Sequence, residues 1–188
     1  MKNHKIPRKF YARNTVDVAK DLLGKILVRR AGQKITSGII IETEAYRQED
    51  DPASHAYRNI TKRNEVMFGQ VGCAYVYFTY GMHHCVNVVA RSNQYRAGAV
   101  LIRALQPAEG IEIMMKNRNT LDISNLTNGP GKLTMALGIT KDQYGEDLVN
   151  SSKLFITDGL ERDQRIIVGP RIGIKKGVDK LWNFRIEI

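Results

Sequence analysis

Strand-like segments recur along almost the whole chain, whereas few segments have the apolar spacing that favours a helix. The clearest pair is residues 74–80 and 85–90, which we expect to form a hairpin that turns at Gly81 and Met82. This pattern predicts an α+β fold: a single domain over residues 1–188 with a curved, largely antiparallel β-sheet and a few peripheral helices. Further strands are expected at residues 26–28, 35–46, 99–105, 154–157, 165–168, 171–174 and 182–188, and helices at residues 15–23, 108–118 and 130–137.

The second of these strands ends in the segment "IETEAY", in which two carboxylates interrupt an apolar run. Because side chains alternate along a strand, Glu42 and Glu44 are expected on the same face. Two interpretations fit this placement. The strand could turn a solvated face outward, since carboxylates are mostly exposed, or one carboxylate could be held at a site where it handles a proton. The polar, irregular stretch that follows, residues 47–64, is long enough to be a functional or mobile loop.

The balance of charge favours an anionic partner. The chain has 29 basic and 19 acidic residues, a net charge of +10, which suits a nucleic acid or an acidic membrane surface, although solubility alone could also explain it. Two cysteines cannot build a disulfide framework, so a reduced, intracellular protein is expected. No apolar run approaches the length of a transmembrane helix. The basic N-terminus is expected to be a solvated tail rather than an arm on a phosphate backbone.

Several common sites can be set aside. The segment "GPGK" at 129–132 resembles a phosphate-binding loop, but Leu133 stands where Ser or Thr is needed. His83, His84 and Cys85 are adjacent on a predicted strand, so they face alternate sides, and no second cluster completes a ligand set. The signatures of zinc deaminases and of G-x-S-x-G hydrolases are absent from the sequence. No metal and no cofactor is therefore expected.

An aromatic segment, "YVYFTYGM" at 75–82, remains to be explained. Tyr75 and Tyr77 share a strand face, and Tyr80 falls at the hairpin tip. These rings could be core packing with one surface tyrosine, or they could be a stacking wall for a base and a wedge for a duplex. Asn87 and Arg103 lie on neighbouring predicted strands, where polar groups need partners.

At this point the residues resemble a known family, the alkyladenine (3-methyladenine) DNA glycosylases of the mammalian-type superfamily. The similar segments occur in family order from about Ala12 to the last strand, and the combination of "ETEAY", "YGM" and "IRALQP" is specific. The long N-terminal extension of mammalian members has no counterpart, so the chain resembles a compact bacterial-type member. The other matching segments are "ARNTVDVAKDLLGKILVR", "RNEVMF", "NGPGKL" and "RIGI".

The resemblance implies a role for individual residues. Glu44 matches the general base that activates water, Arg103 matches the arginine near that water and a backbone phosphate, and Ile172 matches the residue whose main-chain carbonyl holds the water. Asn87 matches the residue that faces the purine 2-position. The resemblance places Tyr46, His55 and Tyr77 in the walls of the base pocket, Tyr80 in the duplex as the intercalated wedge, and Met82, His83, Arg58 and Lys132 against DNA. His83 and His84 stand where mammalian members carry aromatic residues, so lesion preference and grip on DNA are expected to differ.

The resemblance thus implies a monofunctional base-excision-repair glycosylase that flips alkylated or deaminated purines out of double-stranded DNA and leaves an abasic site. A monomer without a membrane partner is expected, located in the bacterial cytoplasm at the nucleoid. The alternative is a non-catalytic basic nucleic-acid-binding module, which charge and aromatic residues alone would fit equally well. The combination of Glu44, Asn87 and Arg103 favours the enzyme, because a binding module has no need for all three.

Overall fold

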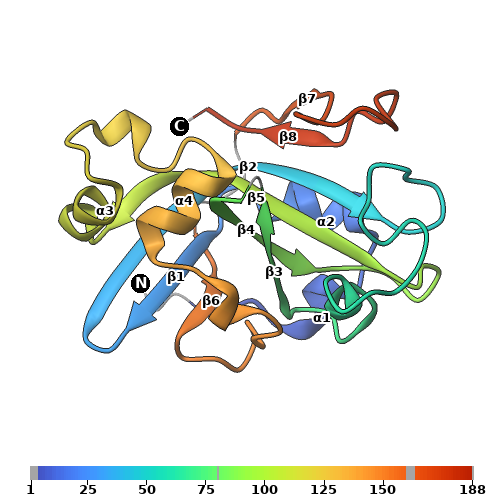
Figure 1. Ribbon diagram of the computed structural model, residues 1–188, viewed down its shortest axis with the longest axis horizontal. Helices are drawn as coiled ribbons and strands as arrows, with labels where there is room; N and C mark the ends of the chain where they lie inside the picture. Colours follow the sequence, from blue (N-terminus) through green and yellow to red (C-terminus); the bar gives the residue numbers. More distant parts are fainter. Residues whose placement is uncertain (1–3, 80, 160–163, 188) are drawn as a thin grey trace.

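The computed structural model describes residues 4–79, 81–159 and 164–187. One curved β-sheet runs through them, with every strand pair antiparallel (Figure 1). Its strand order is β3-β4-β5-β2-β1-β6, and β8 also pairs with β2 and carries β7 at its other side. The strands are β1 (Ile26–Ala31), β2 (Lys34–Arg47), β3 (Ala74–Thr79), β4 (His83–Val89), β5 (Gly98–Glu109), β6 (Leu154–Thr157), β7 (Ile167–Gly169) and β8 (Asn183–Arg185).

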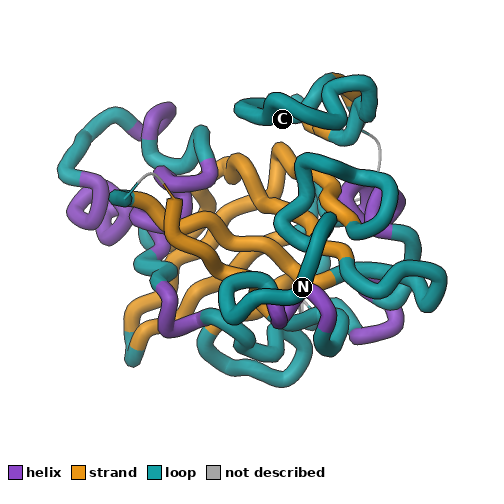
Figure 2. Tube along the Cα trace, turned by 45° about the vertical axis from the view of Figure 1, so that its right-hand side comes forward, coloured by secondary structure: helices purple, strands orange, loops and turns teal. Residues whose placement is uncertain are grey.

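The helices are short and lie at the edges and faces of the sheet (Figure 2). Helix α2 begins at the N-cap Asn14, whose side chain accepts a hydrogen bond from the N–H of Val16, and it packs on β2 and β5. Helix α4 begins with Pro130 and ends at Gly138, which adopts a left-handed conformation, and it packs on β4 and β5. The α-helices are α1 (Arg8–Tyr11), α2 (Thr15–Asp21), α3 (Ile111–Arg118) and α4 (Pro130–Leu137), and single 3-10 turns lie at Glu65–Phe68, Ile123–Asn125 and Lys141–Gln143. The predicted α+β fold with a curved antiparallel sheet and peripheral helices is confirmed.

The apolar core lies between the sheet and these helices. It joins distant parts of the chain, because α2, the central strands, α4 and β8 all contribute fully or nearly fully buried side chains. Burial of this kind supplies most of the driving force for folding. Among the largest of these side chains are Tyr11, Leu22, Leu27, Ile40, Ile102, Met114, Leu126, Leu133, Ile139 and Phe184.

Several sequence predictions are wrong in detail. The last strand, predicted at 182–188, spans only Asn183–Arg185. The N-terminal segment is not a solvated tail over its described residues: Ile6 is buried and its N–H bonds to Ile156, and Arg8 pairs with Asp147 at 2.6 Å. The helix predicted at 108–118 begins only at Ile111, since β5 continues to Glu109. The strand predicted at 171–174 is a run of turns, in which Gly173 has φ +76 and interrupts extended backbone.

Two further findings bear on the sequence expectations. No helix among the described residues is long and apolar enough to cross a membrane. Tyr80, the predicted wedge at the hairpin tip, lies outside the described residues.

Candidate active site

The site is built on the second half of β2, where the strand that pairs along one of its two edges changes from β1 to β8. Strand β1 pairs with β2 over residues 34–39, and β8 takes its place along the same edge at Glu42–Glu44. On the other edge the register of β5 slips, and Arg103 stands between two paired positions without a partner residue on β2. Such bulges re-aim side chains and occur next to active sites. Here the bulge places Arg103 against both carboxylates of the "IETEAY" segment.

Glu44 is fully buried and its carboxylate accepts hydrogen bonds from four donors among the described residues. Oε2 accepts from the Tyr46 hydroxyl at 2.7 Å and from Nη1 of Arg103 at 3.4 Å. Oε1 accepts from the main-chain N–H of Ile172 at 2.7 Å and from Nδ2 of Asn183 at 3.1 Å. A buried carboxylate is costly unless it is paired and hydrogen-bonded, and these donors compensate that cost. Glu44 is therefore not part of a solvated face, which was one of the two interpretations of this strand.

Glu42 shares two of these partners. Its Oε1 accepts from Nε of Arg103 at 3.3 Å and from Nδ2 of Asn183 at 2.7 Å. Arg103 thus contacts both carboxylates, and so does Asn183. The two glutamates are on the same face, as the alternation predicted, and they are joined by a common cation and a common amide.

Tyr46 stays protonated beside Glu44. Burial, and next the negative charge of Glu44, hold the pKa of the Tyr46 hydroxyl far above its usual range. A protonated hydroxyl donates to the carboxylate, as the 2.7 Å contact shows. The guanidinium of Arg171 lies over the Tyr46 ring, 4.6 Å from its centroid, and fixes the ring plane.

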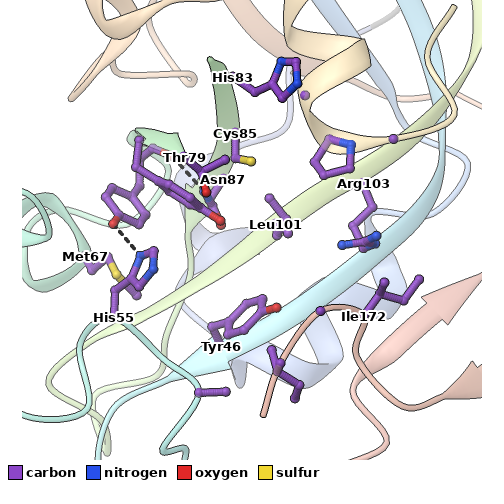
Figure 3. A pocket seen from close by; sticks show the side chains of 18 of the residues that line it. Tyr46, His55, Met67, Thr79, His83, Cys85, Asn87, Leu101, Arg103 and Ile172 are labelled. Carbon is purple, nitrogen blue, oxygen red and sulfur yellow. Dashed lines mark hydrogen bonds between the residues drawn. The ribbon is translucent and has the colours of Figure 1, made fainter. Parts of the chain in front are cut away.

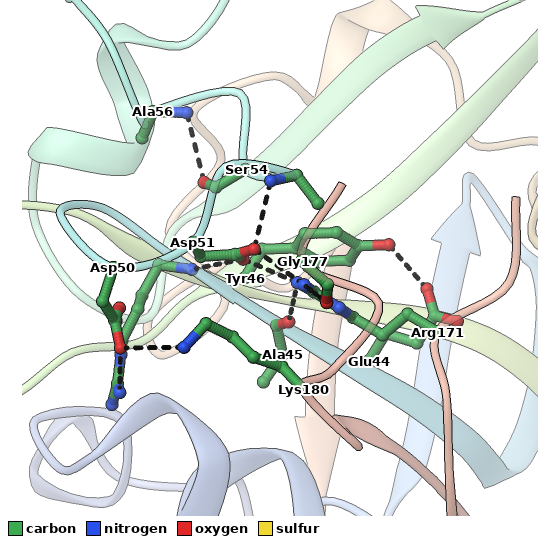
Figure 4. Close-up of polar contacts among 12 residues, drawn as sticks. Glu44, Ala45, Tyr46, Asp50, Asp51, Ser54, Ala56, Arg171, Gly177 and Lys180 are labelled. Atoms are coloured by element: carbon green, nitrogen blue, oxygen red, sulfur yellow. Dashed lines mark hydrogen bonds and ion pairs between the residues drawn. The ribbon is translucent and has the colours of Figure 1, made fainter. Parts of the chain in front are cut away.

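Arg171 is itself held in a buried network that joins three segments (Figure 4). Its guanidinium forms a two-pronged ion pair with Asp51 at 2.6 and 2.7 Å, and neither side chain is exposed to solvent. It also donates to the carbonyls of Ala45, at 2.9 Å, and Gly177, at 3.2 Å. The network therefore ties the loop after β2 to the turn that carries Ile172.

A cavity of about 620 Å³ opens next to this cluster (Figure 3). Three of the lining residues, Tyr46, Arg103 and Ile172, are also partners of Glu44, so the carboxylate lies directly behind the cavity wall. The wall is otherwise formed by the loop after β2, the β3–β4 hairpin, the start of α4 and the turn at 172–176. Its remaining members are Pro52, Ala53, His55, Met67, Tyr75, Tyr77, Thr79, His83, Cys85, Asn87, Leu101, Gly129, Pro130, Gly131, Lys132, Gly173, Ile174, Lys175 and Lys176.

One side of the cavity is an aromatic wall. The rings of His55 and Tyr77 meet edge to face with centroids 4.7 Å apart, and Nδ1 of His55 lies 2.8 Å from the Tyr75 hydroxyl. Burial lowers the pKa of His55, and the nearby positive charge of Arg63 lowers it further. His55 is therefore a neutral ring at pH 7, so this side of the cavity wall carries no charge from the imidazole.

Asn87 forms part of the floor between this wall and Arg103. It is buried on β4, and its Nδ2 donates to the carbonyl of Tyr75 at 2.9 Å. This bond fixes the plane of the amide. A fixed polar group on the floor of an apolar cavity is suited to reject ligands of the wrong hydrogen-bonding pattern.

Two of the described residues that are expected to contact DNA, His83 and Lys132, line the cavity. Met82 is 65% exposed at the hairpin tip, and Arg58 is exposed in the loop after β2. Nζ of Lys132 donates to the side-chain carbonyl of Asn128 at 2.8 Å. Their contacts with DNA, and the individual roles assigned to the residues around Glu44, stay predictions.

Three residues of the cluster were missed in the sequence: Asp51, Arg171 and Asn183. The alternation of the last strand assigns Asn183 to the polar face together with Arg185, yet Asn183 is buried against two carboxylates. Asp51 lies in the polar stretch 47–64, which was expected to be a functional or mobile loop but gave no role to this residue. Arg171 lies in the matching segment "RIGI" without a role of its own. In the described part of the chain, no group of three or more His, Cys, Asp or Glu side chains is arranged to hold a metal ion.

Comparison with known proteins identifies the class to which this fold and site belong. The model of the methylpurine-DNA glycosylase family matches residues 9–188. The chain therefore belongs to that family, and it is an enzyme, a DNA glycosylase that hydrolyses N-glycosyl bonds. Membership sets aside the alternative of a non-catalytic binding module.

Relatives at high identity agree with this assignment. A protein of Carboxydothermus hydrogenoformans named "Putative 3-methyladenine DNA glycosylase" is 50% identical over 183 residues, which cover 97% of this chain and 95% of the relative. Proteins of the same name from Prosthecochloris aestuarii and Methanoculleus marisnigri are each 47% identical; the matches cover 95% and 97% of this chain, and 86% and 95% of the relatives. The similarity extends over most of the length of this chain and of each relative.

Proposed function

We propose that this glycosylase removes alkylated or deaminated purines, such as 3-methyladenine, 7-methylguanine, hypoxanthine and ethenoadenine, from double-stranded DNA and leaves an abasic site. It would act as a monomer in the bacterial cytoplasm, with residues 1–188 as a single catalytic domain. The observation that carries the proposal is the position of Glu44, buried directly behind the wall of a cavity that is lined by aromatic rings. The names of the relatives support the substrate class.

The cavity suits a base that has left the duplex. Its volume of about 620 Å³ lies within the usual range of ligand sites, roughly 300–1,000 Å³. A target base cannot be reached inside a helix, so it must be rotated out, and stacking in the pocket compensates part of the cost. Alkylated purines are electron-poor or cationic, and the negative faces of Tyr77 and Tyr46 attract them. Basic residues at the rim, Lys132, Lys175 and Lys176, would hold the phosphates on either side.

Glu44 would act as the general base. Of its four contacts, the 3.4 Å contact with Arg103 is the longest, and Arg103 also lines the cavity. A water that enters between them can donate a proton to Oε2 while its oxygen bonds to the sugar C1′. The C1′–N bond breaks through an oxocarbenium-like sugar and its electron pair leaves with the base. The carboxylate also stabilises the positive charge on the sugar.

Ile172 would contribute through its main chain. Its N–H donates to Oε1 of Glu44, which helps to hold the carboxylate in place. The carbonyl of the same residue is the group that the family resemblance assigns to the water. Neither a Schiff base nor lyase activity is expected, because no amine is matched to a nucleophilic role.

The test is the variant Glu44→Gln, which keeps the size of the side chain but cannot accept a proton. Single-turnover excision of hypoxanthine from duplex DNA, read as strand scission after alkali, should fall by at least 100-fold, the lower range for a lost general base. Binding to lesion DNA should persist. Glu42→Gln is the matched control, since it removes the neighbouring carboxylate and should keep excision. Equal rates for Glu44→Gln and the unaltered protein would show that Glu44 is not the base.

A further inference from the structure

Two carboxylates lie side by side next to the cavity, and their arrangement poses a problem of charge. Glu42 and Glu44 both contact Arg103, but this arginine supplies one positive charge for two negative ones. Like charges repel when they lie close together, and a neutral donor shared between two carboxylates offsets part of that repulsion. A general base must be ionised to accept a proton from water.

Asn183 is placed to relieve this problem. It stands opposite Glu44 in the register of β8 with β2, and it is buried. Its Nδ2 donates to Oε1 of Glu42 at 2.7 Å and to Oε1 of Glu44 at 3.1 Å. The side-chain amide nitrogen of Asn183 carries two hydrogens, so it can donate one to each carboxylate. Because both carboxylates only accept hydrogen bonds, the nitrogen of the amide, and not its oxygen, must face them.

We propose that Asn183 is a positioning residue that keeps Glu44 ionised and oriented toward the cavity by donating to both carboxylates at once, so that no proton bridges them. The inference rests on the proposed role of Glu44 as the base. Asn183 does not belong to the cavity wall, so its effect on substrate is exerted through Glu44. This separates it from the residues that line the pocket.

Other charged or titratable groups also face Glu44 and contribute to the same balance. Tyr46 donates from β2 and remains protonated, and Arg103 approaches from β5. Burial raises the pKa of the Cys85 thiol on β4, and the negative charge of Glu44 adds to this to a smaller degree, so the thiol stays neutral. The cation of Arg171 is neutralised by Asp51. Glu42 is the nearby anion that hydrogen-bonds to both shared partners, Arg103 and Asn183. A further cation, Arg185, stands directly opposite Glu42 in the register of β8 with β2.

Single-turnover excision of hypoxanthine across pH tests the proposal with three variants. At low pH the excision rate should rise with pH as the base ionises, and this rise is the acidic limb of the profile. Asn183→Ala removes the shared donor and should shift the acidic limb to higher pH by about one unit, so that the excision rate at a given acidic pH falls about tenfold. Asn183→Asp has the same shape but adds a third carboxylate, and should move the limb further. The double variant Glu42→Gln/Asn183→Asp swaps the amide and the carboxylate between these two positions. The cluster again holds one amide and two carboxylates, so the acidic limb should return toward its original pH.

Binding and a remote variant provide the controls. The dissociation constant for lesion DNA should change by less than threefold in each of the three proteins, because Asn183 lies behind the cavity wall. Asn117→Ala removes an amide that donates to the carbonyl of Ala136, far from the carboxylates in the fold, and should leave the profile unchanged.

The outcomes are distinct. A loss of rate that is uniform across pH in Asn183→Ala and Asn183→Asp, or a double variant with no recovery, would overturn the proposal and leave Asn183 a structural residue. If Asn183→Ala fails to fold, Asn183→Asp and the double variant Glu42→Gln/Asn183→Asp still test whether Asn183 acts on Glu44. If instead Glu44→Gln excises normally, the proposed function fails first, independently of Asn183.

Discussion

Removing the negative charge of Asp51 should strongly destabilise the protein, because Asp51 neutralises a buried arginine. The variant is Asp51→Asn, which keeps the shape of the side chain. Asp51 and Arg171 are both fully buried, and their two hydrogen bonds measure 2.6 and 2.7 Å. In the variant, one carboxylate oxygen becomes an amide that faces a guanidinium N–H, and the buried positive charge loses its counter-ion.

The magnitude follows from this geometry. Breaking a buried ion pair by removing one partner costs about 3–5 kcal/mol, because an uncompensated charge remains. In a chain of 188 residues, about 1 kcal/mol corresponds to roughly 2–4 °C in the unfolding midpoint. The midpoint should therefore fall by about 6–20 °C.

The neighbouring residue offers a matched control. Asp50 also pairs with basic side chains, Arg47 and Lys180, but it is 39% exposed. Partly exposed pairs contribute about 1 kcal/mol or less, so Asp50→Asn should cost no more than that. Both variants are measured by urea unfolding followed by circular dichroism, which gives the free energy of unfolding.

A double variant tests whether the loss of stability comes from the uncompensated charge of Arg171. Arg171→Met combined with Asp51→Asn removes both charges, and its cost should be well below the sum of the two single changes. A cost for Asp51→Asn no larger than that for Asp50→Asn, or strict additivity in the double variant, would refute the reasoning.

Two further predictions concern the cavity. Asn87→Ser shortens the amide on the cavity floor and should raise the release of normal guanine from mismatched duplexes severalfold, as measured by strand scission; unchanged guanine release would contradict its role in selectivity. Arg63→Gln removes a positive charge beside His55, so the pKa of His55 should rise toward 6.5, which an NMR titration of the imidazole can follow. Because the folded pKa is depressed, His55 contributes stability above pH 6.5 that is lost as pH falls through its folded pKa, and this loss should be smaller in Arg63→Gln. A titration unaffected by the substitution would show that burial alone sets the pKa.

Local patterns in the sequence were enough to predict most of the scaffold. Strand β6 (Leu154–Thr157) and helix α4 (Pro130–Leu137) have the predicted bounds, and β3 and β4 form the predicted hairpin. These elements depend on alternation, on a proline at a helix start and on glycine at a turn, which are all properties of neighbouring residues. The common face of Glu42 and Glu44 follows from the same alternation.

The parts that were missed depend on partners distant in sequence. Asn183 contacts Glu44 across 139 positions, and Arg171 contacts Asp51 across 120. Neither contact leaves a local pattern, because a buried asparagine and a buried arginine look like surface residues until their acceptors are known. The bulge at Arg103 is hidden for the same reason: the register of β5 against β2 is set by both strands together.

The replacement of β1 by β8 along one edge of β2 has a consequence for the time at which the enzyme becomes active during synthesis. Glu44 leaves the ribosome early, but two of its four donors among the described residues, the N–H of Ile172 and the amide of Asn183, are translated near the end of the chain. Until β8 reaches its place beside β2, the carboxylate has neither of them. A nascent chain that stops before Asn183 would carry the aromatic wall and the basic rim without the amide that holds Glu44. If Glu44 is the base, as proposed, excision of damaged bases begins only once the last strand is made.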